Sequence, residues 1–144
     1  MKSLNSTNTA KNVEKWGELR EVCLYRYMTY NNIPENVNSF VRFFVLEAIK
    51  GLKTRESSKL VVHCSDGIGM SAVLVAIANG IESLAKRGSV DVYNIVKVLR
   101  NDRAGAVEQF DQYRFIYEAL QEYLVQMRDS QQEYINNSDI TSSI

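Results

Sequence analysis

A cysteine followed by a glycine-containing loop carries most of the chemistry available to this sequence. Cys64 comes directly after apolar residues 60–62, and the loop behind it contains Gly67 and Gly69 before Ser71. Glycines let several backbone N–H groups of a tight loop converge on one point, and a following helix N-terminus adds its dipole. Such a cradle binds anions and favours a thiolate. We therefore expect the pKa of Cys64 to fall and its sulfur to act as a nucleophile.

The residues around this loop predict a strand before it and a helix after it. Residues 60–62 are Leu-Val-Val, which is typical of a short strand. Apolar residues recur at helical spacing over 71–87, at Val73, Leu74, Ile77, Ile81 and Leu84. The same patterns predict one or two strands within 18–30, a helix capped by Asn38 or Ser39 and ended by Gly51, and helices over 90–99 and 110–128.

The spacing of these residues resembles the signature of the tyrosine-specific protein phosphatases. His63-Cys64, five intervening residues, position 70 and Ser71 match it in order, and we call residues 63–71 the signature loop. The resemblance implies that Cys64 is the nucleophile and that His63 orients the loop. It also implies that the phosphate is held by Ser65, Asp66, Gly67, Ile68, Gly69, Met70 and Ser71. The Ser71 hydroxyl would help stabilise the thiolate; the alternative is that it caps the helix.

Two further stretches resemble the same family in order and spacing. Residues 30–35, followed by Ser39, resemble the mobile loop that carries the general acid. Residues 100–117 resemble the loop and helix that position the hydrolytic water, where the family places two glutamines. Glu108 aligns with the first of these glutamines and Gln112 with the second. Only Gln112 therefore carries over as a supporting residue.

Three departures from the family pattern predict weak or absent catalysis. Met70 replaces the arginine that grips phosphate bidentately, and a thioether donates no hydrogen bond. Losing two charge-assisted hydrogen bonds removes roughly 3 to 6 kcal/mol, or about two to four decades of rate. No carboxylate precedes Pro34 to protonate a leaving group, and Glu35 follows it, which removes a further ~10²- to 10⁴-fold. Asp66 adds a fixed negative charge that disfavours a phosphate dianion.

The resemblance implies an α/β fold that is a truncated form of the phosphatase domain. We expect a small central sheet flanked by about four helices, with the signature loop between a strand and a helix. Residues 1–15 are expected to form a flexible arm, 16–129 the partial domain, matching the C-terminal part of the family's domain, and 130–144 a flexible tail. The shortened sheet would keep an unpaired edge, through which copies of the chain could associate.

Composition bounds the remaining choices. The chain has 144 residues, 45% of them hydrophobic, with 17 basic and 17 acidic side chains, so we expect one domain and neither nucleic-acid nor membrane binding. Cys23 and Cys64, without a secretory signal, indicate reduced thiols in the cytoplasm. No second histidine and no cysteine pair accompany His63 as metal ligands, so we expect no metal and no cofactor. Eroded copies of this kind look like those in the phosphatase sets of wasp-associated viruses, which would place the chain in host cytoplasm.

Three interpretations of function stay open on these grounds. The favoured one is a catalytically inactive phosphatase homologue, a pseudophosphatase, that binds a phosphotyrosine protein or another signalling protein. The second is a weak phosphotyrosine phosphatase that uses Cys64 and the loop amides alone. The third is a gene remnant that does not fold by itself.

Overall fold

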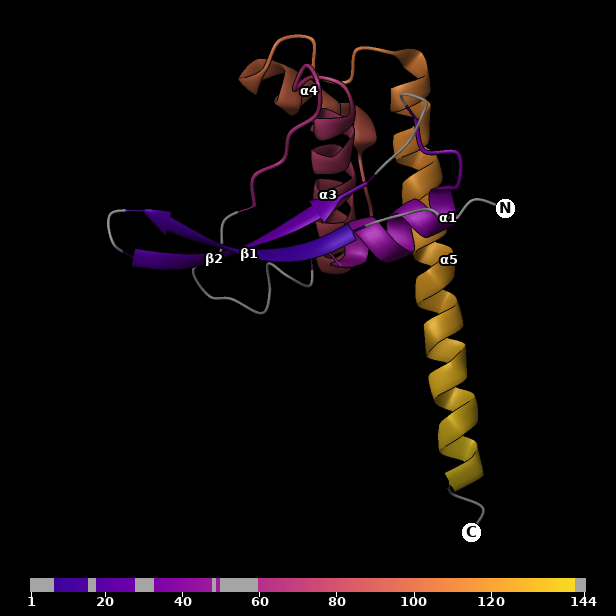
Figure 1. Cartoon of the computed structure of the whole chain (residues 1–144). Helices are drawn as coiled ribbons and strands as arrows, with labels where there is room; N and C mark the ends of the chain where they lie inside the picture. The colour runs from indigo at the N-terminus through magenta and orange to yellow at the C-terminus, as the bar shows by residue number, and fades with distance from the viewer. Residues whose placement is uncertain (1–6, 16–17, 28–32, 48, 50–59, 142–144) are drawn as a thin grey trace. The chain divides into compact units, whose positions relative to one another are not determined.

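A two-stranded antiparallel hairpin forms the first regular structure of the chain. Strand β1 (Thr7–Lys15) pairs with strand β2 (Glu18–Arg26), in a register that places Ala10 opposite Cys23 (Figure 1). The structure is a computed structural model that describes residues 7–15, 18–27, 33–47, 49 and 60–141. Residues 7–15 are thus a strand where we expected a loose arm, because their pairing partner follows within a few residues.

The chain divides into two compact units, Met1–Val61 and Val62–Ile144. In the first unit, helix α1 (Val37–Phe40) continues directly into a π-helical turn, η1 (Val41–Val45). Asn36, and not Asn38 or Ser39, caps this helix, because its side-chain Oδ1 accepts the backbone N–H of Ser39 at 2.9 Å. The predicted end at Gly51 and most of the acid loop, residues 28–32, lie outside the described residues.

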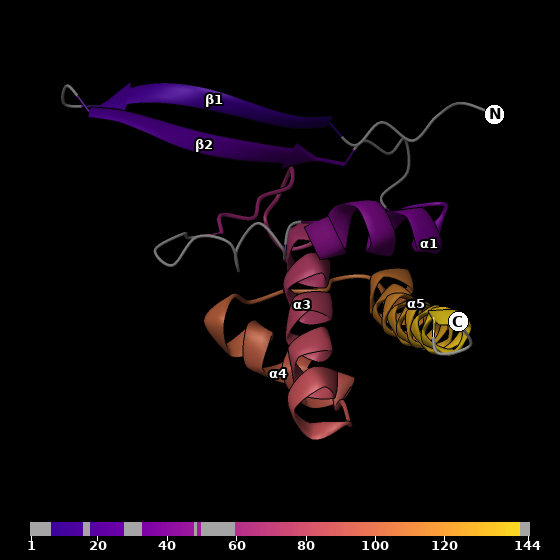
Figure 2. The same ribbon diagram turned by 90° about the horizontal axis from the view of Figure 1, so that it is seen from below.

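Three helices build the second unit. Helix α3 (Met70–Arg87) lies between α4 (Val92–Asp102) and α5 (Phe110–Thr141), and it contacts both (Figure 2). Their shared core is almost wholly apolar and includes Val73, Ala76, Ile77, Val96, Val107, Phe115, Ile116 and Ala119. Burying these side chains is the main stabilising contribution to this unit.

Local caps set the helix ends in this unit. Gly88 has φ +67°, and its N–H donates to the Leu84 carbonyl at 2.9 Å, which ends α3 as the sequence predicts. The Asp91 carboxylate accepts the N–H of Asn94 at 2.9 Å, so α4 begins at Val92 and not at Val90. Helix α5 continues to Thr141 through a stretch where we expected a frayed tail.

The predicted central sheet is not confirmed. Among the described residues the β1–β2 hairpin is the one sheet, and residues 60–64 form no regular element. A strand requires a neighbour for its backbone hydrogen bonds, and the described segments supply none to residues 60–64. Strands and helices together fit the α/β class, with helix predominant. The partial domain over 16–129 stays a prediction.

Candidate active site

The signature loop leads directly into helix α3. Gly69 is the N-cap of that helix and Met70 its first residue, and the Gly69 carbonyl accepts the N–H of Val73 at 3.1 Å. Gly67 turns the chain with φ +75°, a conformation that side chains disfavour. The loop-to-helix junction predicted from the sequence therefore forms, although the strand before it does not.

Asp66 folds its carboxylate back onto the amides of its own loop. The Oδ1 atom accepts the backbone N–H of Ile68 at 2.9 Å and that of Gly69 at 3.0 Å. It also accepts the Cys64 thiol at 3.1 Å. The two backbone hydrogen bonds, followed by the thiol, lower the pKa of Asp66 from 3.8 to about 2. Asp66 is exposed and ionised at neutral pH, and these hydrogen bonds stabilise its charged form further.

Cys64 is half-buried, and the loop surrounds its sulfur. Gly67 donates its backbone N–H to Sγ at 3.2 Å, and the buried Ser71 hydroxyl oxygen lies 3.3 Å from the same sulfur. The thiol is free of any disulfide. The thiol can donate its one proton to the Asp66 carboxylate or to the Ser71 hydroxyl oxygen, and either hydrogen bond exists only for the neutral thiol. The nucleophilic form of a cysteine is the thiolate.

Position 70 places a methionine where a phosphate clamp would be needed. Met70 is half-buried at the first position of α3, and its thioether has no proton to donate. A guanidinium does reach the loop from elsewhere, since Arg103 donates from Nη2 to the Asp66 carbonyl oxygen at 3.3 Å. That hydrogen bond restrains the loop backbone. Among the described residues, no other arginine donates a hydrogen bond to the loop.

The stretch after α4 is hydrogen-bonded to the signature loop. Val107, itself at φ +58°, donates its N–H to the Ile68 carbonyl at 2.9 Å. Arg100 holds this stretch by donating from Nε to the Ala106 carbonyl at 2.9 Å and from Nη2 to that of Val107 at 2.8 Å. We had not assigned Arg100, Arg103 or Val107 to the site. The sequence signal that could have identified them is the closely spaced pair of arginines, Arg100 and Arg103, before Gly105.

Gln112 lies against the signature loop. Its side chain is only 4% exposed, and its Oε1 accepts the N–H of Gln109 at 3.3 Å. A Cβ built on Gly69 would lie 3.0 Å from Gln112 Nε2, so the two residues are in close contact. Glu108, by contrast, is exposed. The structure thus brings Gln112 to Gly69, and its role toward a water molecule stays a prediction.

The remaining predicted site residues make fewer contacts. His63 and Ser65 are both exposed, and neither has a hydrogen bond within the segments that the structure describes. The proposed role of His63 in orienting the loop therefore stays a prediction. The same segments contain no cluster of three or more His, Cys, Asp or Glu side chains that could hold a metal. They also include no helix with the length and apolar character needed to cross a bilayer.

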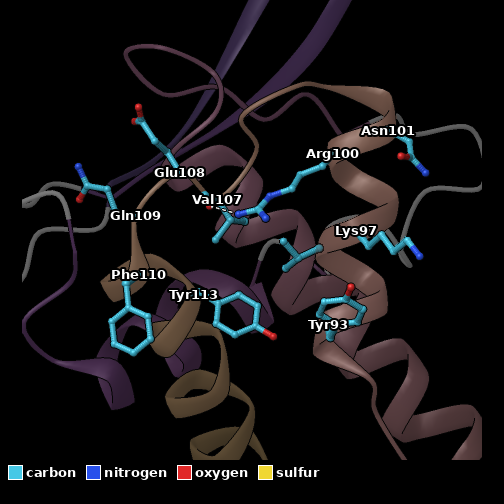
Figure 3. A pocket seen from close by; sticks show the side chains of 10 residues that line it. Tyr93, Lys97, Arg100, Asn101, Val107, Glu108, Gln109, Phe110 and Tyr113 are labelled. Atoms are coloured by element: carbon cyan, nitrogen blue, oxygen red, sulfur yellow. Dashed lines mark hydrogen bonds between the residues drawn. The ribbon is translucent and has the colours of Figure 1, made fainter.

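A separate pocket of about 460 Å³ opens between α4 and the start of α5. Figure 3 shows Tyr93, Lys97 and Arg100 on the α4 side and Phe110 and Tyr113 on the α5 side. No residue of the signature loop lines it. The pocket is therefore distinct from the anion cradle, by which we mean the backbone N–H groups of residues 67–69.

Comparison with known proteins decides the family. A sequence profile described as protein-tyrosine phosphatase matches residues 2–122. The chain belongs to the protein-tyrosine phosphatase family. Among similar phosphatases, it is 31% identical over 121 residues to tyrosine-protein phosphatase 69D of Drosophila melanogaster, which covers 83% of this chain and 8% of that protein. It is 36% identical over 94 residues to tyrosine-protein phosphatase non-receptor type 7 of Rattus norvegicus, covering 65% of this chain and 26% of that protein.

This phosphatase-family chain spans about a quarter or less of the curated relatives it matches. The profile match also includes residues 2–15, so the segment that we expected to be an arm falls within the phosphatase homology. The family assignment rests on the match over residues 2–122, and the signature loop lies within that match.

Proposed function

We propose that this phosphatase homologue is catalytically inactive and acts by binding a protein partner. The observation that carries the proposal is the Asp66 carboxylate, whose Oδ1 accepts two amides of the cradle and the proton of the Cys64 thiol. A nucleophilic sulfur must lose that proton, and a phosphate must find free amides. Both requirements conflict with the contacts of Asp66.

Two absent side chains support the same proposal. Met70 can make neither of the two charge-assisted hydrogen bonds of a guanidinium, which are worth about 1.5 to 3 kcal/mol each. The segment that ends at Pro34 has no carboxylate to protonate a leaving group. The rate losses from the missing arginine and the missing general acid do not add simply, because both groups belong to one catalytic unit. Either loss alone, at its smaller value, lowers the rate by about two decades.

The partner in this proposal is a phosphotyrosine protein or another signalling protein, met in a reducing cytoplasm where the Cys64 thiol stays free. The hairpin of β1 and β2 has two edges, and self-association through one of them is part of the proposal. A phosphotyrosine peptide and its unphosphorylated form, titrated in parallel, would separate recognition of phosphate from recognition of sequence.

The proposal of inactivity is tested by turnover of p-nitrophenyl phosphate. We expect the wild-type chain to release no more nitrophenol than the Cys64→Ser variant. The reason is that the Cys64 sulfur does not attack the substrate in the wild-type chain, and the variant lacks it. A wild-type rate well above background that disappears in Cys64→Ser would contradict the proposal. A cooperative thermal transition of both proteins is the control that they are folded, and it would also exclude a remnant that cannot fold.

The alternative is a weak phosphatase that uses Cys64, and one set of contacts favours it. The Gly67 N–H and the Ser71 hydroxyl both lie within hydrogen-bond distance of the sulfur, where they would stabilise a thiolate. This alternative predicts that Met70→Arg raises the rate sharply, because the substitution restores the phosphate clamp. No gain in a folded Met70→Arg variant would count against it.

A further inference from the structure

We propose that the pocket between α4 and the start of α5 is a second binding site, which receives an aromatic side chain carried by an acidic segment of a partner protein. This inference rests on the proposed function, because that function is to bind a protein partner, and it names the chemistry of the bound segment. None of the residues that line the pocket belongs to the signature loop. The two sites can therefore be tested separately.

The inside of the pocket suits a flat apolar group. Its volume of about 460 Å³ is in the range of sites that bury a small ligand or a large side chain. Val96 and Val107 line it and are 2% and 0% exposed, so its base is apolar. Tyr93 contributes a ring from α4, and Phe110 and Tyr113 contribute two from α5 (Figure 3). Because aromatic rings pack favourably against one another, this lining favours an aromatic occupant.

Two of the three rings are open to solvent. Phe110 is 76% exposed and Tyr93 is 66% exposed, although both line the same pocket. Single exposed apolar side chains are ordinary, whereas several around one pocket are typical of an interaction site. Aromatic residues are also the anchors that contribute most of the binding energy in protein interfaces. The surface therefore fits a protein segment better than a small polar molecule.

The charges at the pocket favour an acidic segment. Two cationic side chains, Lys97 and Arg100, line it together with one acidic side chain, Glu108. No hydrogen bond or ion pair joins Lys97 to another of the residues that the structure describes. Arg100 uses Nε and Nη2 on the carbonyls of Ala106 and Val107, which leaves Nη1 for another acceptor. A carboxylate beside the aromatic anchor would pair with these donors.

Val107 connects the pocket to the signature loop. It lies at the base of the pocket and donates its N–H to the Ile68 carbonyl at 2.9 Å. It has φ +58°, a conformation that β-branched residues rarely adopt, and Arg100 holds its carbonyl. An occupant that packs on Val107 should therefore be detected in the NMR signals of this residue.

The test is an NMR titration of the ¹³C,¹⁵N-labelled wild-type chain with the terminally blocked peptide Asp-Glu-Trp-Glu-Asp. We expect the methyl signals of Val96 and Val107 to shift, and those of Val125, which is exposed on α5 and does not line the pocket, to stay unmoved. No shift of the Val96 and Val107 signals at about 1 mM peptide would overturn the proposal.

Two matched peptides separate the aromatic and the acidic contributions. One carries Ala in place of Trp, and the other carries Asn and Gln in place of the acidic residues. Each should bind at least about tenfold more weakly than the parent peptide, because burial of the ring and pairing of the charges both contribute to affinity. Equal affinity of either matched peptide and the parent would overturn the proposal.

Variants of the chain locate the binding energy. Lys97→Gln and Phe110→Ala change exposed side chains, so both should stay folded, and we expect each to lower the affinity about tenfold. Lys86→Gln on α3 removes the same charge outside the pocket, and Leu124→Ala shortens another exposed apolar side chain of α5. Both controls should bind like wild type. A loss in Lys86→Gln as large as that in Lys97→Gln would show general charge attraction and would overturn the proposal.

The same spectra keep this inference apart from the proposed function. Shifts caused by the acidic peptide and confined to the signature loop would overturn the inference and would support binding of a partner at the loop. Turnover of p-nitrophenyl phosphate would instead contradict the proposed inactivity. The titration with the acidic peptide would still decide the role of the pocket.

Discussion

Arg103 donates a hydrogen bond from its guanidinium to the backbone carbonyl of Asp66, which lies 37 positions earlier in the chain. Val107 reinforces the same junction by donating to the Ile68 carbonyl at 2.9 Å. These two contacts join the stretch after α4 to the signature loop. The shape of the loop therefore depends on Arg103 and Val107 as well as on the residues of the loop itself.

Arg103→Gln should loosen the signature loop. The hydrogen bond to Asp66 joins partly exposed groups, so we expect a loss of unfolding free energy of no more than about 1 kcal/mol. The larger effect should be faster amide exchange at residues 67–69, measured by NMR. Arg128→Gln, on the exposed surface of α5, is the control. Unchanged exchange in Arg103→Gln would show that the loop holds its shape without this contact.

Gly67→Ala should destabilise the protein through both backbone strain and a clash. Gly67 has φ +75°, and an added Cβ would lie 2.9 Å from Arg103 Nη2. The strain alone costs about 1 to 2 kcal/mol. Gly88→Ala is the matched control, because Gly88 has φ +67° and open space around the Cβ position. Urea unfolding should show a larger loss for Gly67→Ala. Equal losses would mean that Arg103 moves aside freely.

Gly80→Ala should destabilise the packing of α3 on α5. The new Cβ would lie 2.7 Å and 2.9 Å from the two methyl groups of Leu120, which is closer than carbon atoms pack. Overpacking costs about 1 to 3 kcal/mol, against a gain in helix propensity of about 1 kcal/mol. Thermal unfolding measures the net effect. Asn79→Ala, at the exposed neighbouring position, should be neutral or stabilising. A stabilised Gly80→Ala would contradict the close approach.

The double variant Gly80→Ala/Leu120→Ala tests the same contact from the other side. Removing the Leu120 methyl groups eliminates the clash but also leaves a cavity. We therefore expect the two substitutions to be non-additive, with the double variant more stable than the sum of the single losses predicts. Strict additivity would mean that Gly80 and Leu120 do not interact.

Acid should weaken the fold through Asp66. Its pKa is lowered from 3.8 to about 2, chiefly by the amides of Gly69 and Ile68. The ionised carboxylate is therefore favoured in the folded state, so its stabilising contribution is present above pH 3.8 and is lost as the pH falls through about 2. The difference in unfolding free energy between wild type and Asp66→Asn should shrink over that interval. A difference independent of pH would contradict the assigned hydrogen bonds.

Local sequence signals predicted the helices of the second unit well. Helix α3 was predicted over 71–87 and runs over Met70–Arg87, because the apolar period and Gly88 are both local features. The start of α4 was predicted at Val90, two residues too early, because Asp91 caps the helix instead of lying inside it. The C-terminal extension of α5 to Thr141 was not predicted, because residues 129–141 are mostly polar and read as a frayed tail.

Strands and side-chain directions were less accessible from the sequence. Residues 60–62 have the composition of a strand, but a strand depends on a partner elsewhere in the chain, and the described residues supply none. At position 66 the sequence predicted a negative charge near the cradle. It could not show that the carboxylate turns inward and accepts the Ile68 and Gly69 amides, because that depends on the loop conformation.

The direction of the Cys64 thiol proton has a consequence for oxidative stress. A thiolate sulfur attacks an oxygen of hydrogen peroxide, breaking the O–O bond and releasing hydroxide, whereas a protonated thiol reacts slowly. As long as that hydrogen points at Asp66, Cys64 should resist conversion to sulfenic acid. The Cys64 thiol would then stay reduced through a burst of peroxide.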